Sequence, residues 1–289
     1  MSFVALITGA SSGIGKAAAR RLAREPGARL VLVARREDLL RTLASELGGA
    51  TVVAVDLVEP GAVARVREAV EREHGQLHLL VNNAGGSWRG PFAEVGWDNV
   101  ERHMKLNFEA PVRLTEELLP LLRATAAASG AGAPRVSVVN VASTAGRVSR
   151  PGSGSYSASK FALAGWSDSL YAEERPHGVH VGLVLPGFVR TEGFPARELL
   201  ASPVMRWIVS KPEVVAEAIV EAGPGGKAER YVPRLYWLAA AARILLPALV
   251  RRATGGGAFS TTAGAGEDGG GPAEGANTVR SESGSGPAD

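Results

Sequence analysis

The residues best suited to chemistry in this sequence are Tyr156 and Lys160, which lie four positions apart. In a helix this spacing is just over one turn, so the phenol and the ammonium group would share one face. A neighbouring cation stabilises phenolate and is expected to lower the pKa of a tyrosine from its usual value of about 10. Such a tyrosine can exchange a proton with an alcohol or a carbonyl oxygen. An exposed pair on a polar helix would show the same spacing, so this interpretation needs support from the rest of the chain.

A glycine-rich segment near the N-terminus provides that support. It follows an apolar run, precedes a helical pattern, and has the spacing G-x-x-x-G-x-G. Glycine lets backbone N–H groups approach a pyrophosphate, whose negative charge is favoured at a helix N-terminus. A plain turn is the alternative, but the position between strand and helix favours a nucleotide-binding loop. The residues expected to contact the cofactor here are Thr8, Gly9, Ser11, Ser12, Gly13, Ile14 and Gly15.

The elements that must position these residues alternate between apolar strands and helices. The predicted strands are 3–7, 30–33, 51–55, 77–81, 136–141 and 179–185, and the main predicted helices are 14–23, 37–47, 97–123 and 155–174. Continuous apolar strands joined by helices indicate a parallel sheet that is covered on both sides. With right-handed crossovers, the sequence predicts an α/β fold: a single Rossmann-type, doubly wound parallel sheet with helices on both faces.

The amino-acid composition limits the fold size and the kinds of chemistry that this protein can have. The 289 residues, 45% of them hydrophobic, suffice for one large domain, and the absence of cysteine excludes disulfides and thiol catalysis. No signal peptide precedes the first strand, which predicts a cytoplasmic protein. Residues 253–289 contain five acids and one arginine, which gives them a charge of −4. Because the whole chain has a net charge of +3, residues 1–252 carry +7. The basic residues are scattered rather than interleaved with aromatics, so we expect no nucleic-acid partner.

Three segments are predicted along the chain. Residues 1–232 form the catalytic Rossmann domain, in which 188–211 is the expected substrate lid. Residues 233–252 carry leucines at helical spacing and predict an amphipathic C-terminal helix. Residues 253–289 are rich in Gly, Ala, Ser and Thr and predict a disordered tail, because so few large apolar side chains cannot offset the entropy of ordering.

Taken in order, these motifs resemble the short-chain dehydrogenase/reductase family, in its single-domain branch. The resemblance covers about residues 3–232. It is carried by the Gly13/Gly15 loop, Asn82-Asn83-Ala84-Gly85, Asn107, Ser143 with Tyr156 and Lys160, and Pro186-Gly187. The glycine spacing argues against the longer epimerase/dehydratase branch, whose loop is usually G-x-x-G-x-x-G. The resemblance implies an enzyme that transfers a hydride between a nicotinamide and a carbonyl or secondary alcohol.

The resemblance also implies a catalytic set of Asn107, Ser143, Tyr156 and Lys160. Tyr156 would exchange the proton and Lys160 would hold down its pKa and bind the nicotinamide ribose. Ser143 would bond the substrate carbonyl oxygen, where charge develops. Asn107 would distort its helix locally and support a proton relay, and the nearby Pro111 fits a kink there.

Several further positions are expected to line the cofactor. The second strand ends in Arg35 and Arg36, and guanidinium groups at that point would pair with a 2′-phosphate. The sequence therefore predicts NADP(H), with NAD(H) as the alternative and a solvated arginine pair as the simpler interpretation. The other positions that the resemblance assigns to the cofactor are Asp56, Leu57, Asn83, Ala84, Gly85, Pro186, Gly187, Val189 and Thr191.

The substrate and partners are less defined by the sequence. Apolar residues in the lid, with Trp88 and Phe92 opposite, suggest a hydrophobic ketone or alcohol, such as a lipid- or steroid-like molecule, although these residues could equally pack the lid onto the body. The five histidines fall at helix ends or connections, so we expect them at the surface. The sequence has no H-E-x-x-H motif or other metal-ligand spacing, so we predict no metal site. The segment 235–252 could contact an anionic membrane surface weakly or pack on protein. The long helices could pair subunits into a homodimer or homotetramer.

Two other classes of function stay open at this point. A non-enzymatic NADP-binding sensor or scaffold could use the same fold, because fold alone does not determine function. Such proteins typically lose the tyrosine or the lysine, and here both are present beside Ser143 and Asn107. A peripheral membrane adaptor would depend only on the C-terminal leucine stripe. The enzyme is therefore the favoured interpretation.

Overall fold

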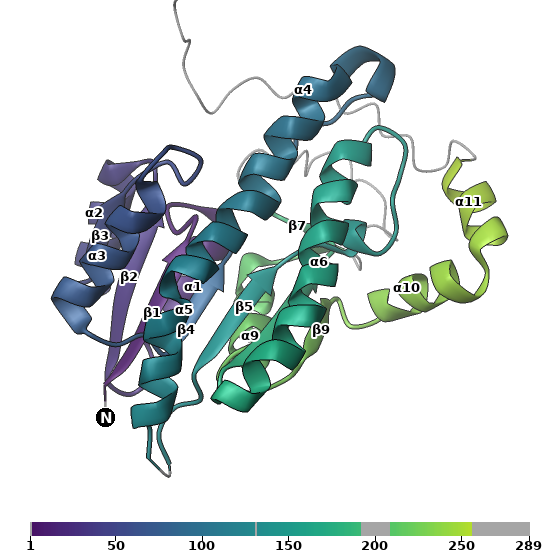
Figure 1. The fold of residues 1–289 in the computed structure, drawn as a ribbon. Helices are drawn as coiled ribbons and strands as arrows, with labels where there is room; N and C mark the ends of the chain where they lie inside the picture. The colour runs from purple at the N-terminus through teal and green to yellow at the C-terminus, as the bar shows by residue number, and fades with distance from the viewer. Residues whose placement is uncertain (1, 131, 192–208, 256–289) are drawn as a thin grey trace, which may run out of the picture.

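A seven-stranded parallel sheet forms the centre of the protein (Figure 1). The computed structural model describes residues 2–130, 132–191 and 209–255. The strand order is β3-β2-β1-β4-β5-β6-β9, and every neighbouring pair is parallel. The strands are β1 Phe3–Thr8, β2 Ala28–Ala34, β3 Thr51–Ala54, β4 Leu79–Asn82, β5 Ser137–Val141, β6 His180–Pro186 and β9 Glu229–Val232. The predicted doubly wound α/β fold is confirmed.

Helices cover both faces of this sheet. One face packs against α1 Gly13–Leu22, α2 Glu37–Glu46 and α9 Pro212–Ala222, and the other against α3 Ala62–His74, α5 Ala110–Ala128 and α6 Gly154–Glu174. Successive residues of a strand point to opposite faces. Accordingly, Ala5 and Ile7 of β1 belong to the first core, and Val4 and Leu6 belong to the second. This burial on both sides explains why the central strands are continuous apolar runs.

The long helix predicted over 97–123 is interrupted in the structure. It consists of α4 Phe92–Met104, a π-helical turn Lys105–Glu109 and α5. Pro111 has no N–H group and therefore cannot donate the regular α-helical hydrogen bond to the carbonyl of Asn107. The local distortion that the family resemblance implies at Asn107 is thus present, and it lies where the chain approaches the carboxyl ends of the strands.

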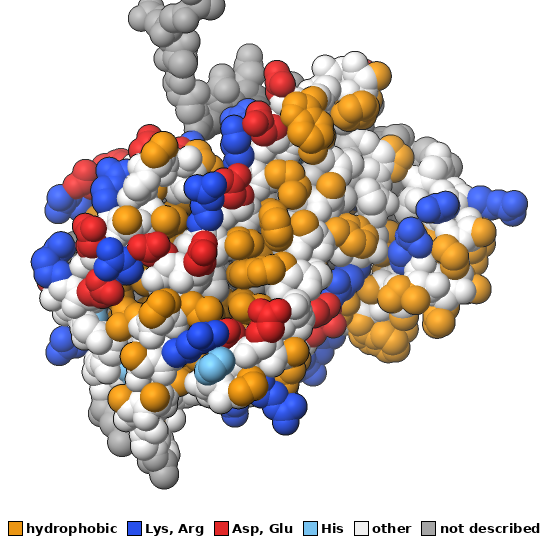
Figure 2. All heavy atoms as spheres, in the orientation of Figure 1, with side chains coloured by type: hydrophobic (Ala, Val, Ile, Leu, Met, Phe, Trp, Pro, Cys, Tyr) orange, Lys and Arg blue, Asp and Glu red, His pale blue; other side chains and the backbone are white. Residues whose placement is uncertain are grey.

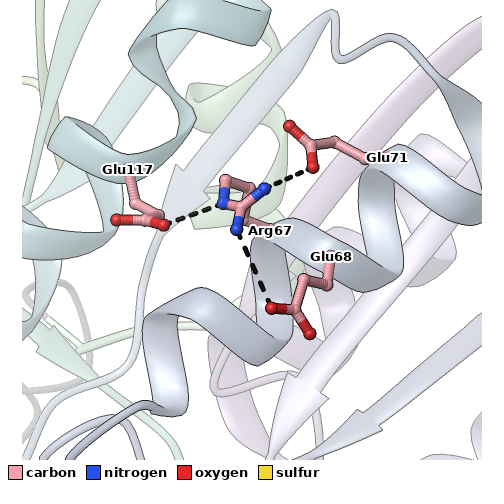
Figure 3. A network of polar contacts seen from close by, with 4 residues as sticks. All are labelled: Arg67, Glu68, Glu71 and Glu117. Carbon is pink, nitrogen blue, oxygen red and sulfur yellow. Dashed lines mark hydrogen bonds and ion pairs between the residues drawn. The ribbon is translucent and has the colours of Figure 1, made fainter.

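Ion pairs connect the helices on the second face. Figure 3 shows Arg67 of α3 between Glu68 and Glu71 of its own helix and Glu117 of α5, with 2.8 Å from Nε to Glu117 Oε1. A more buried pair joins α5 to the end of α6, where Arg123 donates to both carboxylate oxygens of Glu174 at 2.8 and 2.6 Å. The Glu174 side chain is only 2% exposed, so this second pair has replaced most of its water.

The region expected to form the substrate lid is only partly described. Its ends form two short parallel strands, β7 Phe188–Val189 and β8 Val209–Ser210. Residues 192–208, which include most of the apolar positions assigned to the lid, lie outside the described residues.

The C-terminal segment differs from its prediction. The single helix expected over 233–252 is two helices, α10 Tyr236–Leu245 and α11 Pro247–Gly255. Pro247 begins the second helix because proline cannot continue the first but fits an N-terminal turn. Both helices lie beyond the β9 edge of the sheet (Figure 1). The expected tail begins inside α11, and its residues 256–289 lie outside the described residues. Over the described ranges, no helix is long and apolar enough to cross a bilayer.

Candidate active site

One cavity of about 1610 Å³ runs along the carboxyl edge of the sheet. Each of the seven strands delivers its following loop, or its own last residues, to the cavity wall. The lining extends from Arg35 and Arg36 after β2, past the glycine loop, to Ser143 and Tyr156 after β5, and continues onto α10 and α11. Ligands in open α/β sheets bind at this edge, where the strand order reverses direction. Here that reversal lies between β1 and β4.

The glycine loop is shaped so that side chains could not replace its hydrogens. Gly9 and Gly13 have φ values of 65° and 53°, a region that other residues seldom adopt. A Cβ atom on Gly15 would lie 2.2 Å from the carbonyl oxygen of Gly9, and one on Gly13 would lie 3.0 Å from Thr191 Cγ2. α1 begins at Gly13, so its positive dipole end faces this cavity. The loop therefore fits the pyrophosphate of a dinucleotide.

Thr8 and Asn83 hold the loops after β1 and β4 together. The Thr8 hydroxyl accepts from the backbone N–H groups of Asn83 and Ala84, both at 2.9 Å, and donates to the carbonyl of Val81 at 3.3 Å. The Asn83 amide donates to the carbonyl of Thr8 at 2.8 Å. Asn83, Ala84 and Gly85 line the cavity, whereas Thr8 lies behind the wall and positions them.

Charged side chains gather at the end of the cavity beside β2 and β3. Arg35 Nη1 lies 3.5 Å from the Asp56 carboxylate, and Arg36 Nη2 donates to the Ser11 hydroxyl at 3.2 Å. Arg35 and Arg36 are exposed, and both line the cavity with Ser11, Asp56 and Leu57. The structure thus brings together the residues predicted for the adenosine end, with two guanidinium groups next to the glycine loop.

Lys160 is held by the backbone of β5, and Asn107 holds the neighbouring Gly86 and Ser159. Its Nζ donates to the carbonyl of Val141 at 3.0 Å, and its side chain is buried. Asn107 Nδ2 donates to the Gly86 carbonyl and to the Ser159 hydroxyl at 3.0 and 3.1 Å, and Asn107 Oδ1 accepts from the Gly86 N–H at 2.9 Å. A Cβ on Gly85 would lie 2.9 Å from Asn107 Oδ1 and 3.5 Å from Lys160 Nζ.

Tyr156 lies next to Ser143 at the middle of the cavity. The Ser143 hydroxyl bonds the phenol, donates to the Pro186 carbonyl at 3.3 Å and accepts from the Ala145 N–H at 3.1 Å. Four residues along α6, Lys160 lies on the same helix face, as predicted. Ser143, Tyr156 and Lys160 thus converge on one point of the wall.

The pKa of Tyr156 is shifted in the direction opposite to the one predicted. Burial raises the pKa of the Tyr156 phenol, and the effects that oppose it are the Ser143 hydrogen bond and the charges of Arg89 and Arg150. Burial also lowers the pKa of Lys160 to about 8, because the ammonium group is taken out of water without a carboxylate partner. Desolvation therefore determines the direction of both pKa shifts, although the two groups lie close together on the helix.

The loop after β6 completes the wall. Gly187 N–H donates to the Val232 carbonyl at 2.8 Å, and the ring of Tyr236 packs so closely on Gly187 that a Cβ there would lie 2.1 Å from it. Pro186, Gly187, Val189 and Thr191 all line the cavity. Thr191 faces Gly13 of the glycine loop, so this segment closes over the middle of the predicted cofactor site.

Three of the predicted site residues do not line the cavity. Thr8, Gly15 and Asn107 are buried behind it, and each shapes or holds a residue that does line it. Phe92, expected opposite the lid, is 68% exposed and lies outside the lining, whereas Trp88 is part of it.

Other lining residues were not predicted. They include Arg89, Arg102, Arg147, Arg150, Tyr231 and Tyr236. The only signal for two of them is that Arg147 and Arg150 stand in the span from Ser143 to Ser167, which contains no acidic residue.

His103 corrects the expectation that all histidines lie at the surface. It is fully buried, its Nε2 accepts from the Trp88 N–H at 3.0 Å, and its Nδ1 lies 2.7 Å from the Asn99 carbonyl oxygen. Burial lowers its pKa, which fits a neutral ring that donates from Nδ1 and accepts at Nε2. Its ring packs edge-on against Trp88 and Tyr156, with centroid separations of 5.0 and 6.0 Å. His103 therefore positions Trp88 at the cavity wall. His78 is buried as well, and its Nδ1 accepts from the Val4 N–H at 3.2 Å.

This fold is the Rossmann-type α/β fold, and its cavity at the carboxyl edge of the sheet has the shape that suits a dinucleotide. A family model described as short chain dehydrogenase matches residues 3–198. The chain belongs to the short-chain dehydrogenase/reductase family, as its motifs predicted. Members of this family generally bind NAD(H) or NADP(H), and they typically act on small molecules as oligomers.

Comparison with individual proteins gives the same family. The chain is 34% identical over 198 residues to dehydrogenase/reductase SDR family member 7B of Bos taurus, covering 65% of this chain and 58% of that protein. It is 36% identical over 187 residues to the oxidoreductase YbbO of Escherichia coli K12, covering 64% and 65%. These matches span less than two thirds of each relative. A solved short-chain dehydrogenase from Streptomyces avermitilis is 29% identical, with a TM-score of 0.69 over 88% of this chain and 98% of that one.

Proposed function

We propose that this protein is an NADP(H)-dependent oxidoreductase that interconverts a carbonyl group and a secondary alcohol on a hydrophobic substrate. The observation that carries the proposal is the convergence of Tyr156, Ser143 and Lys160 on one cavity that begins at the glycine loop. Apolar residues continue this cavity beyond Tyr156. They are Trp88, Val148, Phe188, Ala239, Ala240 and Val250. Such walls favour a substrate with an apolar body.

The roles of the catalytic residues follow from their contacts. When bound, the nicotinamide supplies or accepts the hydride. Ser143 donates a hydrogen bond to the substrate oxygen, where negative charge develops. Tyr156 gives this oxygen a proton, and its raised pKa keeps the phenol protonated and able to donate. Lys160 stabilises the phenolate left behind, and Asn107 holds the Gly86 backbone beside it.

Cofactor preference is proposed from the two arginines after β2. Arg35 and Arg36 lie at the cavity end that holds Asp56, and a guanidinium there attracts the extra phosphate of NADP(H). The double change Arg35→Gln with Arg36→Gln removes both charges but leaves the glycine loop intact. We expect it to weaken NADPH binding about 100-fold and NADH binding less than three-fold, because charge-assisted contacts to phosphate are worth about 1.5–3 kcal/mol.

Fluorescence titration of the reduced cofactors measures both affinities. Arg41→Gln is the matched control, because Arg41 is an exposed arginine of α2 that pairs with Glu37 and does not line the cavity. Tighter binding of NADH than NADPH by the unmodified protein would reject the preference for NADP(H).

We also propose that α10 and α11 contact an anionic membrane surface. Their exposed side chains form an apolar patch with cations beside it (Figure 2). The apolar members are Trp237, Leu238, Ile244, Leu245, Leu246 and Leu249. The cations are the exposed Arg251 and Arg252 and the half-buried Arg243. The span 236–255 contains no acidic residue, which favours negatively charged lipid. Ala239 and Val250 of the same helices line the cavity, so an apolar substrate could enter from that surface.

Flotation of the chain with vesicles tests this contact. We expect binding to vesicles that contain phosphatidylserine, weaker binding to neutral phosphatidylcholine vesicles, and loss of binding in a Leu245→Glu, Leu249→Glu variant. The matched control is Val214→Glu, an exposed apolar residue of α9 outside the patch. A chain that stays in the aqueous fraction would contradict the membrane contact. A dimer that the same double variant dissociates would instead assign the patch to a second subunit. A homodimer or homotetramer and a cytoplasmic location stay predictions.

A further inference from the structure

Two loops bring a pair of arginines to the wall beside Tyr156. Arg89 follows β4 and Arg150 follows β5, and both line the cavity. The Gly90 N–H donates to the Gly152 carbonyl at 2.9 Å, so the two loops lie side by side. The N–H and the hydroxyl of Ser153 both donate to the Arg150 carbonyl, at 3.2 and 2.9 Å, which holds the Arg150 backbone in place.

The side chain of Arg150 is also supported. Its guanidinium carbon lies 4.8 Å from the centroid of the Phe188 ring, a distance at which a cation is attracted to the aromatic face. Phe188 begins β7, the short strand that follows β6. Arg150 is therefore half-buried between three segments of the active-site edge and is not a freely solvated surface arginine.

The charge of this pair is not neutralised by the described part of the chain. Two other cations of this wall have carboxylate partners, since Arg147 Nη2 lies 2.9 Å from Glu229 and Lys105 Nζ lies 3.0 Å from Glu101. Asp56 is the only acid among the lining residues that the structure describes, and it pairs with Arg35 at the far end. Within the described ranges, no ion pair contains Arg89 or Arg150.

An uncompensated, half-buried cation is unfavourable unless a ligand supplies the opposite charge. Burial lowers the pKa of Arg150, and the charge of Arg89 lowers it further. Both arginines also lower the pKa of Tyr156, which places their charges within electrostatic range of the phenol. A negative group bound between them would therefore lie close to the reacting carbonyl.

We propose that Arg150, assisted by Arg89, binds a carboxylate of the substrate, so that the preferred substrate is an oxo acid or the corresponding hydroxy acid. A planar guanidinium matches a carboxylate with two parallel hydrogen bonds. The apolar wall of Trp88, Phe188 and Ala239 then receives the hydrocarbon chain. This inference rests on the proposed oxidoreductase function and adds the class of substrate and the residue that selects it.

The experiment compares a medium-chain 4-oxo acid with its methyl ester, which has the same ketone but no charge. Reduction is followed at the NADPH absorbance band for the full chain, for Arg150→Gln and for Arg150→Lys. We expect the wild-type KM for the acid to be about ten-fold below that for the ester. Arg150→Gln should raise the ratio of the acid's KM to the ester's KM about ten-fold. Arg150→Lys should fall between, because it keeps the charge without the planar fork.

The matched control is Arg113→Gln, an exposed arginine of α5 that pairs with Glu109 and does not line the cavity. It removes the same charge and should leave the ratio of the two KM values unchanged. A wild-type chain that reduces the ester as well as the acid would overturn the carboxylate inference and leave the oxidoreductase function standing. The same conclusion follows if Arg150→Gln changes both substrates equally.

Failure of the proposed function has a different signature. If the wild-type chain with NADPH reduces neither compound nor any carbonyl of a wider panel, the oxidoreductase function is overturned. Equilibrium dialysis of the 4-oxo acid then tests the subsite without turnover. Retention of the acid by wild-type protein and by Arg113→Gln, but not by Arg150→Gln, supports the carboxylate site, and equal retention by all three contradicts it. A thermal melt of each variant shows that it is folded.

Discussion

At the scale of single residues, desolvation controls the two ionisable groups that matter most. Lys160 is 4% exposed and bonds only the Val141 carbonyl among the described residues, which lowers its pKa to about 8. Burial raises the pKa of Tyr156. The phenol is therefore a proton donor through the neutral pH range, and Lys160 changes its charge within the range of an ordinary assay.

The lowered pKa of Lys160 predicts a stability that depends on pH. The folded pKa of about 8 is below the unfolded value of about 10.4, so the unfolded chain binds more protons between these limits. The free energy of unfolding should therefore rise, through this group, as the pH increases from about 8 to about 10. Below pH 8 the buried charge costs on the order of 3 kcal/mol.

Urea unfolding of wild type and Lys160→Met at pH 7 and pH 9.5 measures this effect. Lys160→Met should be the more stable protein at pH 7, and its advantage should shrink by about 2 kcal/mol at pH 9.5. Lys105→Met is the matched control, because the Lys105 side chain is 53% exposed and stays in water. An advantage that does not change with pH would contradict the assigned cause.

The sequence predicted Tyr156, Ser143 and Lys160 as candidate catalytic residues, because they occur in short motifs with a characteristic spacing. It did not predict the direction of the Tyr156 pKa shift, which depends on how much water the folded wall removes from the phenol. Arg150 and His103 were missed for a similar reason. Their environments are formed by the contacts of three loops and of α4, and no local pattern encodes those contacts.

At the scale of elements, the Arg123–Glu174 ion pair between α5 and α6 is expected to contribute more to the free energy of unfolding than the Arg67 network of Figure 3. Arg123→Met leaves the Glu174 carboxylate, 2% exposed, without its partner, which should lower the free energy of unfolding by about 2 kcal/mol. Arg67→Met is the matched control, because Glu71 and Glu117 are 45% and 33% exposed and water can replace the arginine. Denaturant unfolding compares the two, and a smaller loss for Arg123→Met than for Arg67→Met would be contrary to this account.

The elements themselves were largely predictable. Six strands appear where apolar runs indicated them, because a sheet buried on both faces requires such runs. β9 was not predicted, since Glu229–Val232 is short and only partly apolar and forms at the sheet edge by pairing with β6. The division of the C-terminal segment at Pro247 was also missed, although proline marks helix starts.

At the scale of the whole molecule, the parallel sheet explains why distant motifs meet. All seven strands point their carboxyl ends toward one edge, so loops from residue 9 to residue 191 converge there. α10 and α11 then extend the same cavity beyond the sheet. The sequence motifs predicted this convergence for the cofactor side, and the substrate side became visible only once β9, α10 and the Arg89 and Arg150 loops were placed.

The most direct test of the account is the change Tyr156→Phe, which removes the phenol oxygen and keeps the ring. NADPH oxidation with a panel of ketones and 4-oxo acids measures turnover, and fluorescence titration of NADPH measures cofactor binding. We predict that kcat falls by about 10²–10⁴-fold, the range of general acid catalysis, while the NADPH affinity changes less than three-fold. A Tyr156→Phe variant that turns over at a rate close to wild type would contradict the assignment of Tyr156 as the proton donor.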